Sequence, residues 1–200
     1  TPAELDAWKQ RVGVAEKGKN YNRIIDGHGT GLRPPTEEEW AELARTTLVI
    51  DSLKYDKLGA PPSVDLSAST AFPPIGNQAS QGSCVAWSIG YYIKTFQEAL
   101  ERGWNLSTVK MIGSWPSYYP DGQLDHLVSP TWIYNQINGG VDGGAAYVHA
   151  ADLVFNLGAA TWNAVPYTVS NYSSWPSEAG YREAPRYRGA MPPDAEWGMH

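Results

Sequence analysis

A long predicted helix that begins at the only cysteine is the feature that most constrains how this chain can fold. Between Cys84 and Gly103, apolar residues recur every three or four positions, which predicts a substantially buried helix with the thiol in its first turn. The apolar positions of this predicted face are Ala86, Ile89, Ile93, Phe96 and Leu100. Ser83 is the candidate N-cap. Because the chain has one cysteine, no disulfide within it can support the fold.

Two further buried helices are predicted after the first. Ser129-Pro130 has the form of a helix start, and Asp142-Gly143-Gly144 leads into the second of these helices. The apolar residues that support them are Trp132, Ile133 and Ile137 in one, and Ala146, Ala150, Leu153, Val154 and Leu157 in the other. Gly158 stands where a C-terminal cap is expected. The apolar faces of these helices are expected to pack together.

Residues 1–60 are predicted to be a helical lead-in segment. Thr1–Glu4 and Thr36–Glu39 both have the form of capping boxes. An apolar stripe is expected on the second of these helices, from Trp40, Leu43 and Ala44. The Gly-rich stretch 26–31 is predicted to be a loop, and it lacks the Gly-Lys-Ser/Thr ending of a phosphate-binding loop.

The remaining segments are predicted from composition and short patterns. Residues 46–50 are a short strand candidate, and Pro61-Pro62 marks a boundary. Residues 169–200 are rich in Pro, Tyr and Ser without periodicity, and they are expected to be an extended connection. The chain thus divides into residues 1–60, 61–168 and 169–200.

Charge and hydropathy exclude some partners. A formal net charge of −6 argues against nucleic acid or an anionic membrane as the main partner. No apolar run approaches the length of about 18 residues of a membrane span. Asp121, Asp125 and Asp142 fit no calcium-loop spacing and are interpreted as solvated turns, so no metal and no cofactor is expected.

The position of Cys84 favours a reactive thiol. A lone cysteine is more often a small buried hydrophobe, but at a helix N-terminus the free amides and the helix dipole stabilise a thiolate. The same amides can donate to an oxyanion on an attacked carbonyl. Gln78, six positions earlier on a turn, offers a side-chain amide as a second donor. The pattern therefore predicts a nucleophile with an oxyanion site beside it.

Two sequence blocks carry a resemblance to a known family. Val64-Asp65-Leu66 is followed by Ile75-Gly76-Asn77-Gln78-Ala79-Ser80-Gln81-Gly82-Ser83-Cys84-Val85-Ala86-Trp87-Ser88. These blocks resemble the start of the mature domain of papain-like cysteine peptidases. The resemblance implies that Cys84 is the nucleophile and that its amide and the Gln78 side chain form the oxyanion hole.

Three later landmarks extend the resemblance over roughly residues 62–168. Residues 127–135 resemble the family's Leu-Ser-Pro helix, Asp142-Gly143-Gly144 its Asn-Gly-Gly, and Val165-Pro166-Tyr167 its Tyr-Pro-Tyr. The resemblance implies that the backbone of Gly143 and Gly144 binds a peptide substrate. It also implies an α+β fold, of which this chain holds the mainly helical left lobe with an N-terminal extension, and places the β-rich right lobe outside the chain.

Departures from the family pattern bear on activity. Gln81 and Asn135 stand where disulfide-forming cysteines occur, as in the disulfide-poor prokaryotic branch, and Val85 replaces a Trp. The family's His and Asn lie about 130–150 residues after the cysteine, beyond the 200 residues of this chain. His28, His126 and His149 are interpreted as surface or hydrogen-bonding residues, and His200 is a poor candidate for the base.

Two functions are therefore carried forward. The first is a secreted cysteine endopeptidase that acts on a peptide or protein substrate, present here without its general base. The second is a non-catalytic extracellular assembly or scaffold protein built on the same lobe. The start at Thr1 and the sequons at Asn105 and Asn171 indicate secretion and candidate glycosylation. The exposed interlobe face predicts association with a C-terminal half of the same precursor or with another subunit.

Overall fold

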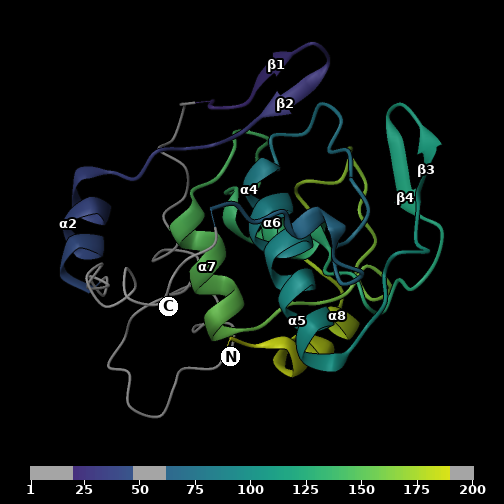
Figure 1. The fold of residues 1–200 in the computed structure, drawn as a ribbon. Coiled ribbons are helices and arrows are strands. Elements are labelled where there is room, and N and C mark those ends of the chain that lie inside the picture. Colours follow the sequence, from purple (N-terminus) through teal and green to yellow (C-terminus); the bar gives the residue numbers. More distant parts are fainter. Residues whose placement is uncertain (1–19, 47–61, 190–200) are drawn as a thin grey trace.

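One continuous helix that begins at Cys84 forms the centre of the structure (Figure 1). The computed structural model describes residues 20–46 and 62–189. The helix comprises α4 (Cys84–Ala86), the π-helix η2 (Trp87–Lys94) and α5 (Thr95–Arg102). Gly103 ends it in the left-handed region at φ 68°, as a C-terminal cap. The helix predicted between Cys84 and Gly103 is confirmed.

The π-helical stretch changes which side of this helix is buried. Tyr91 is fully buried, whereas Ile93 and Leu100 are 56% and 58% exposed. The prediction that Ile93 and Leu100 belong to the buried face is therefore wrong. It assumed 3.6 residues per turn throughout, and hydrogen bonds to the fifth residue widen the turn and rotate the following residues around the axis.

Two buried helices pack on the start of the central helix. These are α6 (Pro130–Ile137) and α7 (Tyr147–Asn156). The hydroxyl of Ser129 caps α6 by accepting from the amide of Trp132, and every residue of α6 is buried. Gly158 follows α7 at φ 91° and donates its amide to the carbonyls of Leu153 and Val154. Both predicted helices are confirmed.

The buried residues form two clusters. The first joins α4, α6 and α7 and contains Trp132, Ile133 and Leu153. The second is rich in aromatic residues: Trp87, Tyr91, Trp162 and Tyr167 contact one another with ring centroids 4.8–6.0 Å apart, mostly edge to face, and the Trp162–Tyr167 pair is tilted. The two clusters together hold the helices that carry Cys84.

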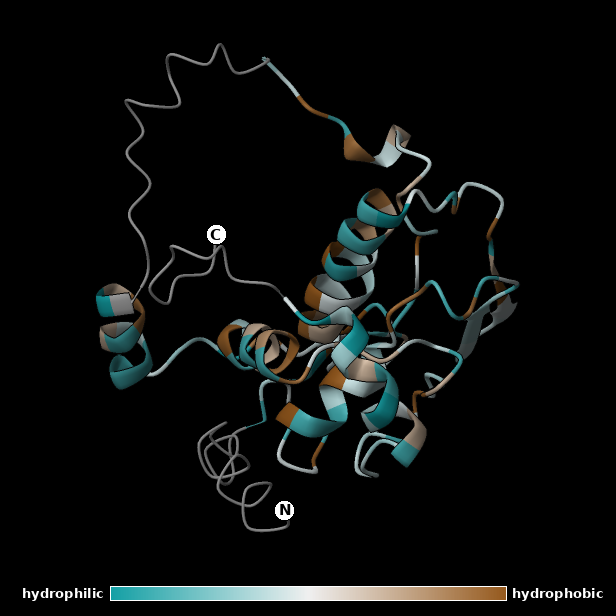
Figure 2. Cartoon of the chain, turned by 90° about the horizontal axis from the view of Figure 1, so that it is seen from below, coloured by the Kyte–Doolittle hydropathy of each residue, from teal (hydrophilic) through white to brown (hydrophobic). Residues whose placement is uncertain are grey.

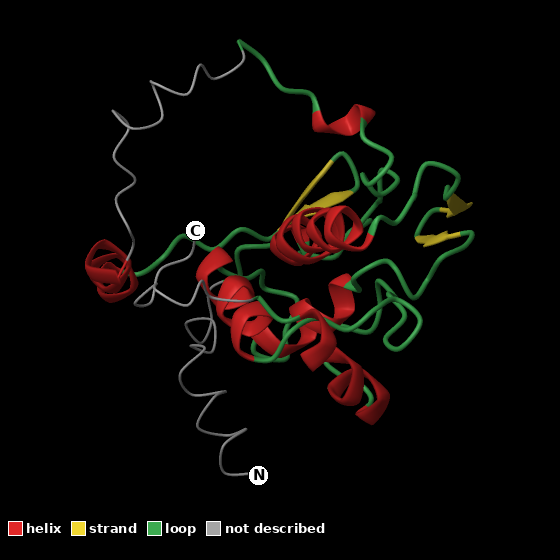
Figure 3. Cartoon of the chain, turned by 60° about the horizontal axis from the view of Figure 1, so that its bottom comes forward, coloured by secondary structure: helices red, strands yellow, loops and turns green. Residues whose placement is uncertain are grey.

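Two antiparallel hairpins are the strand content of the described part (Figure 3). The first pairs β1 (Arg23–Ile25) with β2 (His28–Thr30), and the second pairs β3 (Met111–Ser114) with β4 (Ser117–Pro120). The prediction of a helical lead-in is wrong for Arg23–Ile25, and the predicted loop at residues 26–31 holds only for the turn, because His28–Thr30 form a strand. Asp26-Gly27, both at positive φ, forms a two-residue hairpin turn, a signal that the helical interpretation did not use.

The lead-in segment does contain one predicted helix, α2 (Glu37–Thr46), at an edge of the molecule. The capping box is confirmed, because Glu39 accepts from the amide of Thr36 at 2.8 Å and the Thr36 hydroxyl accepts from the amide of Glu39 at 3.2 Å. The predicted apolar stripe is not buried, since Trp40 is 59% exposed. Much of α2 is hydrophilic (Figure 2), so polar contacts of Glu39 hold it instead.

The segment after residue 168 is not extended throughout. It contains the short helix α8 (Glu178–Glu183), followed by η3 (Ala184–Tyr187). Gly180 lies against Trp132 and Val165, and the side chain of Tyr181 contacts the Trp132 ring edge to face. The expectation of an extended connection is wrong here, because a helix of six residues is too short to show a periodic pattern.

Several predictions lie outside the described residues. They are the capping box at Thr1–Glu4, most of the strand candidate at residues 46–50, and Pro61. In the part that is described, none of the helices has the length and apolar character to cross a membrane.

The position of Ile93 on the central helix can be tested against Ile133 on α6. Ile133 is fully buried in the first cluster and Ile93 is 56% exposed. Ile133→Ala is expected to lower the free energy of unfolding by about 2–5 kcal/mol, because it leaves a cavity. Ile93→Ala is expected to lower it by less than about 1 kcal/mol. Urea unfolding of this chain measures both, and equal losses would contradict the rotated face.

Candidate functional site

Cys84 is the first residue of the central helix, as the sequence predicts. The first amides of a helix have no acceptor within the helix, so Cys84 lies at the end of the helix that carries free donors. The side chain is half-buried, and it lies against the cluster formed by α4, α6 and α7. Ser83 precedes the helix but makes no side-chain cap. Its hydroxyl lies 3.2 Å from that of Tyr167.

Gln78 is held as a donor beside this helix start. Its Nε2 donates to the carbonyl of Gly29 at 2.6 Å and to the carbonyl of Gln81 at 2.9 Å. The Tyr167 hydroxyl donates to the carbonyl of Gln78 at 2.9 Å. Burial raises the pKa of Tyr167 to about 12, so its hydroxyl keeps its proton at neutral pH. The side-chain amide of Gln78 thus donates to a backbone carbonyl, that of Gly29, which belongs to another segment of the chain.

That other segment is residues 20–33, which we call the strap. It includes the β1–β2 hairpin, and Figure 1 shows it passing over the start of α4. The amide of Gly31 donates to the Sγ of Cys84 at 3.3 Å. The amide of Gly29 donates to the carbonyl of Ala79 at 2.8 Å. The strap backbone therefore contacts both the thiol and the loop that leads to it.

The strap also pairs with residues 142–145, which we call the edge segment. Ala145 donates to the carbonyl of Gly31 at 2.7 Å and accepts from the amide of Arg33 at 2.8 Å. This is a parallel bridge centred on Leu32. The carbonyl of Gly143 accepts from the amide of Tyr21 at 2.9 Å. The edge segment thus binds both arms of the hairpin through its backbone, Tyr21 on the arm that leads into β1 and Gly31 and Arg33 on the arm that follows β2.

The predicted substrate-binding glycines have different roles in this pairing. Gly143 supplies a carbonyl, but the amide of Gly144 is used internally, because it donates to the Tyr134 hydroxyl at 3.2 Å. Ala145 supplies the paired amide and carbonyl. Gly144 is required for space: its φ is 92°, and a Cβ there would lie 2.2 Å from the carbonyl oxygen of Gly31.

Asp142 joins the edge segment to the loop before Cys84. Its Oδ1 accepts from the amide of Gly82 at 2.8 Å and from the Tyr134 hydroxyl at 2.6 Å. Its Oδ2 accepts from Nδ2 of Asn22 on the strap at 3.0 Å. Burial raises the pKa of Tyr134, and the hydrogen bond to Asp142 raises it further. The Tyr134 hydroxyl therefore keeps its proton and remains a donor. The interpretation of Asp142 as a solvated turn residue is therefore wrong.

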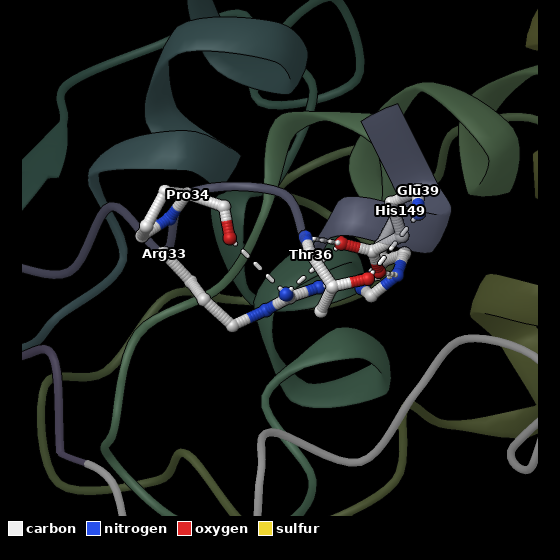
Figure 4. Close-up of polar contacts among 5 residues, drawn as sticks. All are labelled: Arg33, Pro34, Thr36, Glu39 and His149. Carbon is white, nitrogen blue, oxygen red and sulfur yellow. Dashed lines mark hydrogen bonds and ion pairs between the residues drawn. The ribbon is translucent and has the colours of Figure 1, made fainter. Parts of the chain in front are cut away.

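The C-terminal end of the strap is fixed by an ion-pair cluster (Figure 4). The guanidinium of Arg33 makes two hydrogen bonds to the carboxylate of Glu39, at 2.7 and 3.0 Å. Nε2 of His149, on α7, lies 2.9 Å from the same carboxylate. Arg33 and His149 are both buried. The cluster therefore ties α2 and the strap to the helical core.

The pKa values in this cluster favour one charge state. Burial tends to raise the pKa of Glu39, but hydrogen bonds from Arg33 and from the Thr36 amide, together with the positive charge of Arg33, lower it to about 2. Burial lowers the pKa of His149; Arg33 lowers it further, and Glu39 acts in the opposite direction. At neutral pH the cluster therefore holds a carboxylate, a guanidinium and a neutral imidazole.

The β3–β4 hairpin contacts the strap from another side. The ring of Trp115 meets that of His28 edge to face at 5.9 Å, and its edge lies near Gly27. His126 stacks on Trp104 at 4.1 Å and bonds to Gln123 at 3.0 Å. These contacts agree with the packing and hydrogen-bonding roles expected for the histidines.

The remaining predicted sites lie on the surface. Asn105 and Asn171 are both exposed. The Asn105 side chain accepts from the amide of Ser107, and that of Asn171 accepts from the amide of Ser174. Within residues 20–46 and 62–189, no group of three or more His, Cys, Asp or Glu residues is arranged to hold a metal ion.

The strap residues at the site were not predicted. A usable signal was present, because Gly29 and Gly31 alternate with larger residues. In an extended chain such residues share one side, and glycines there mark the close approach of another backbone.

Comparisons with known proteins support the fold. No protein-family model matches the sequence, and no curated protein matches it. Three chains of solved structures match, one of which is xylellain, a cysteine protease from Xylella fastidiosa. The TM-score is 0.54 at 18% identity, and the match covers 87% of this chain and 59% of that chain. This chain thus spans less than two thirds of that structure, and its mixed fold of helices and small strands resembles the fold of a cysteine protease.

Proposed function

We propose that the chain is the nucleophile-bearing part of a papain-like cysteine endopeptidase. One observation carries the proposal. At the site of Cys84 an extended peptide segment is bound, with its backbone paired to the edge segment and one carbonyl on Nε2 of Gln78. A peptide substrate requires these same three elements: a strand partner, a thiol and a carbonyl donor.

The chemistry follows from these groups. The Sγ of Cys84 attacks the substrate carbonyl carbon, and the amides of the helix start and Gln78 stabilise the oxyanion. The C–N bond breaks as the amine takes a proton from a general base that received the thiol proton. Water then hydrolyses the thioester and restores the thiol. By the resemblance, the base is a His of a second lobe.

The strap inhibits the site in this proposal. The backbone amide of Gly31 donates to the Cys84 sulfur, and the carbonyl of Gly29 accepts from the side-chain amide of Gln78. Neither the sulfur nor the Gln78 side chain is therefore available to a substrate carbonyl. Of the roles left open for the lead-in segment, the inhibitory one explains these contacts. Secretion, and glycosylation at the exposed Asn105 and Asn171, are part of the same proposal.

A non-catalytic assembly protein is the alternative. The tight fit of the strap favours it, because a permanently covered thiol needs no general base. In that case the strap is a structural element, and the second partner is a subunit rather than a catalytic lobe.

Activity is expected only in the full-length protein that contains this chain. General-base assistance contributes about 10²–10⁴ in rate, so residues 1–200 alone are expected to have no useful activity. Turnover of a fluorogenic peptide by the full-length protein should be lost in Cys84→Ala and retained in a change at His126, which stacks on Trp104. An active protein that is indifferent to Cys84→Ala would refute the proposal.

Loosening the strap is expected to expose Cys84. A Cβ at Gly31 would lie 1.8 Å from the carbonyl oxygen of Gly82, so Gly31→Ala forces the strap away. If this substitution destabilises the docked strap by about 1.4 kcal/mol, the alkylation of Cys84 by iodoacetamide becomes about tenfold faster. Gly122→Ala is the matched control, because its Cβ would meet nothing within 4 Å. Equal rates in the two variants would show that the strap does not cover the thiol.

Lowering the pH from 7 to 5 is expected to weaken strap docking. Burial holds the pKa of His149 below its ordinary 6.5, and departure of Arg33 and Glu39 opens its surroundings. The released state then binds a proton more readily, so docking is strongest above pH 6.5 and weakens as the pH falls through that value. Below pH 4.5, protonation of Glu39 in the released state adds to the loss, down to about pH 2.

The measurement for this prediction is the ratio of Cys84 alkylation rates in the wild-type protein and in His149→Gln. The ratio cancels the pH dependence of the alkylation chemistry, which both proteins share. It should rise as the pH falls from 7 to 5. A ratio that does not change with pH would show that His149 does not control docking.

A further inference from the structure

The side chain of the strap residue Asn22 directs its Nδ2 at two acceptors outside the strap, while its Oδ1 accepts from the amide of Thr30 within the strap at 3.1 Å. Its Nδ2 donates to the carbonyl of Ser80 at 3.1 Å and to Oδ2 of Asp142 at 3.0 Å. Gly82 forms the floor, since a Cβ there would lie 2.8 Å from the Asn22 Cγ. Gly82 is two residues before Cys84 in the chain. We call the surroundings of Nδ2, formed by Ser80, Gly82 and Asp142, the Asn22 subsite.

The carboxylate of Asp142 divides its two oxygens between two tasks. Oδ1 is committed to the protein, because it accepts from the Gly82 amide and from the Tyr134 hydroxyl. Oδ2 accepts from Asn22, which leaves with the strap. A released strap therefore uncovers a carboxylate oxygen and a carbonyl, side by side, next to the edge segment. A substrate side chain that enters there has to supply the missing donors.

The subsite also lies where a bound chain would reach it. The amide of Tyr21, the residue before Asn22, donates to the carbonyl of Gly143. Tyr21 and Asn22 lie on the arm that leads into β1, whereas Gly31 and Arg33 lie on the arm that follows β2. A chain that donates to the carbonyl of Gly143 as Tyr21 does therefore places its next side chain over Gly82. The charge of Asp142 adds an electrostatic preference, because a cation strengthens the hydrogen bond and an anion is repelled.

We propose that Asp142 is a specificity-determining residue. It selects substrates in which the side chain that lies over Gly82 carries an N–H donor, above all Lys or Arg. This inference rests on the proposed peptidase function, and it adds the substrate class. The strap mimics such a substrate, because the side-chain amide of Asn22 is the donor to Asp142. Glu or Asp at that position is disfavoured, and apolar side chains are intermediate.

Asp142→Asn is the informative variant. The new side chain keeps an oxygen that accepts from Gly82 and Tyr134, and it replaces Oδ2 by a donor. The readout is kcat/KM of the full-length protein for matched peptides with Lys, norleucine or Glu at each position in turn, in the Gly31→Ala background that loosens the strap.

At one position the protein with Asp142 is expected to prefer Lys over norleucine by about tenfold or more. In Asp142→Asn this preference should fall to about threefold or less, with the largest loss of rate for the Lys peptide and an improved Glu peptide. A protein with Asp142 and no preference would overturn the inference. An equal loss for all three peptides would also overturn it, since it would make Asp142 purely structural.

A second readout keeps the inference testable if no peptide is cleaved, an outcome that would count against the peptidase itself. Asn22→Asp replaces the donor by an oxygen facing Asp142, so it is expected to release the strap and speed Cys84 alkylation about tenfold. Asn20→Asp is the control, because the Asn20 oxygen already accepts from the Asn22 amide and can go on doing so. Combining Asn22→Asp with Asp142→Asn should restore part of the protection, and a double variant as fast as Asn22→Asp alone would refute the subsite.

Discussion

Three backbones meet at Cys84 because each of them has a glycine where it touches the next. A Cβ at Gly31 would overlap the carbonyl of Gly82, and one at Gly144 would overlap the carbonyl of Gly31. These approaches let the strap amide reach the sulfur and let Ala145 pair with the strap. Asp142 then fixes two of the backbones to each other by accepting from Gly82 while belonging to the edge segment. The site depends on this contact more than on any one side chain.

The helical core supplies the rigid support for that contact. Helices α6 and α7 pack against the start of the central helix, and Tyr134 on α6 reaches both Asp142 and the amide of Gly144. The aromatic cluster supports the other side through Tyr167, which holds Gln78. Two buried tyrosines thus position the donor and the edge segment, so the geometry around the thiol is set by packed elements and not by loops alone.

The sequence predicted the helices better than it predicted the strap. The helices beginning at Cys84, Pro130 and Tyr147 could be predicted from sequence because an apolar face or a cap is a local property. The burial of Tyr91 in place of Ile93 could not, since a π-helical turn depends on how neighbours pack. The docking of Gly29 and Gly31 depends on pairing with residues about 50 and 110 positions away, and no local pattern encodes such pairing. For the site, the nucleophile and its donor were proposed from sequence, while Asp142 was misread as a solvated turn residue.

The central claim is that the strap docks as a unit on the thiol and on the edge segment. Hydrogen exchange of the backbone amides tests it most directly, because the amides of Gly31, Arg33 and Ala145 are donors in the docked state alone. If the strap docks as a unit, these three amides are protected in the protein and Gly31→Ala lowers their protection together, while the amide of Leu153 on α7 keeps its protection. Fast exchange at Gly31 and Arg33 in the unaltered protein, alongside a protected α7, would contradict it.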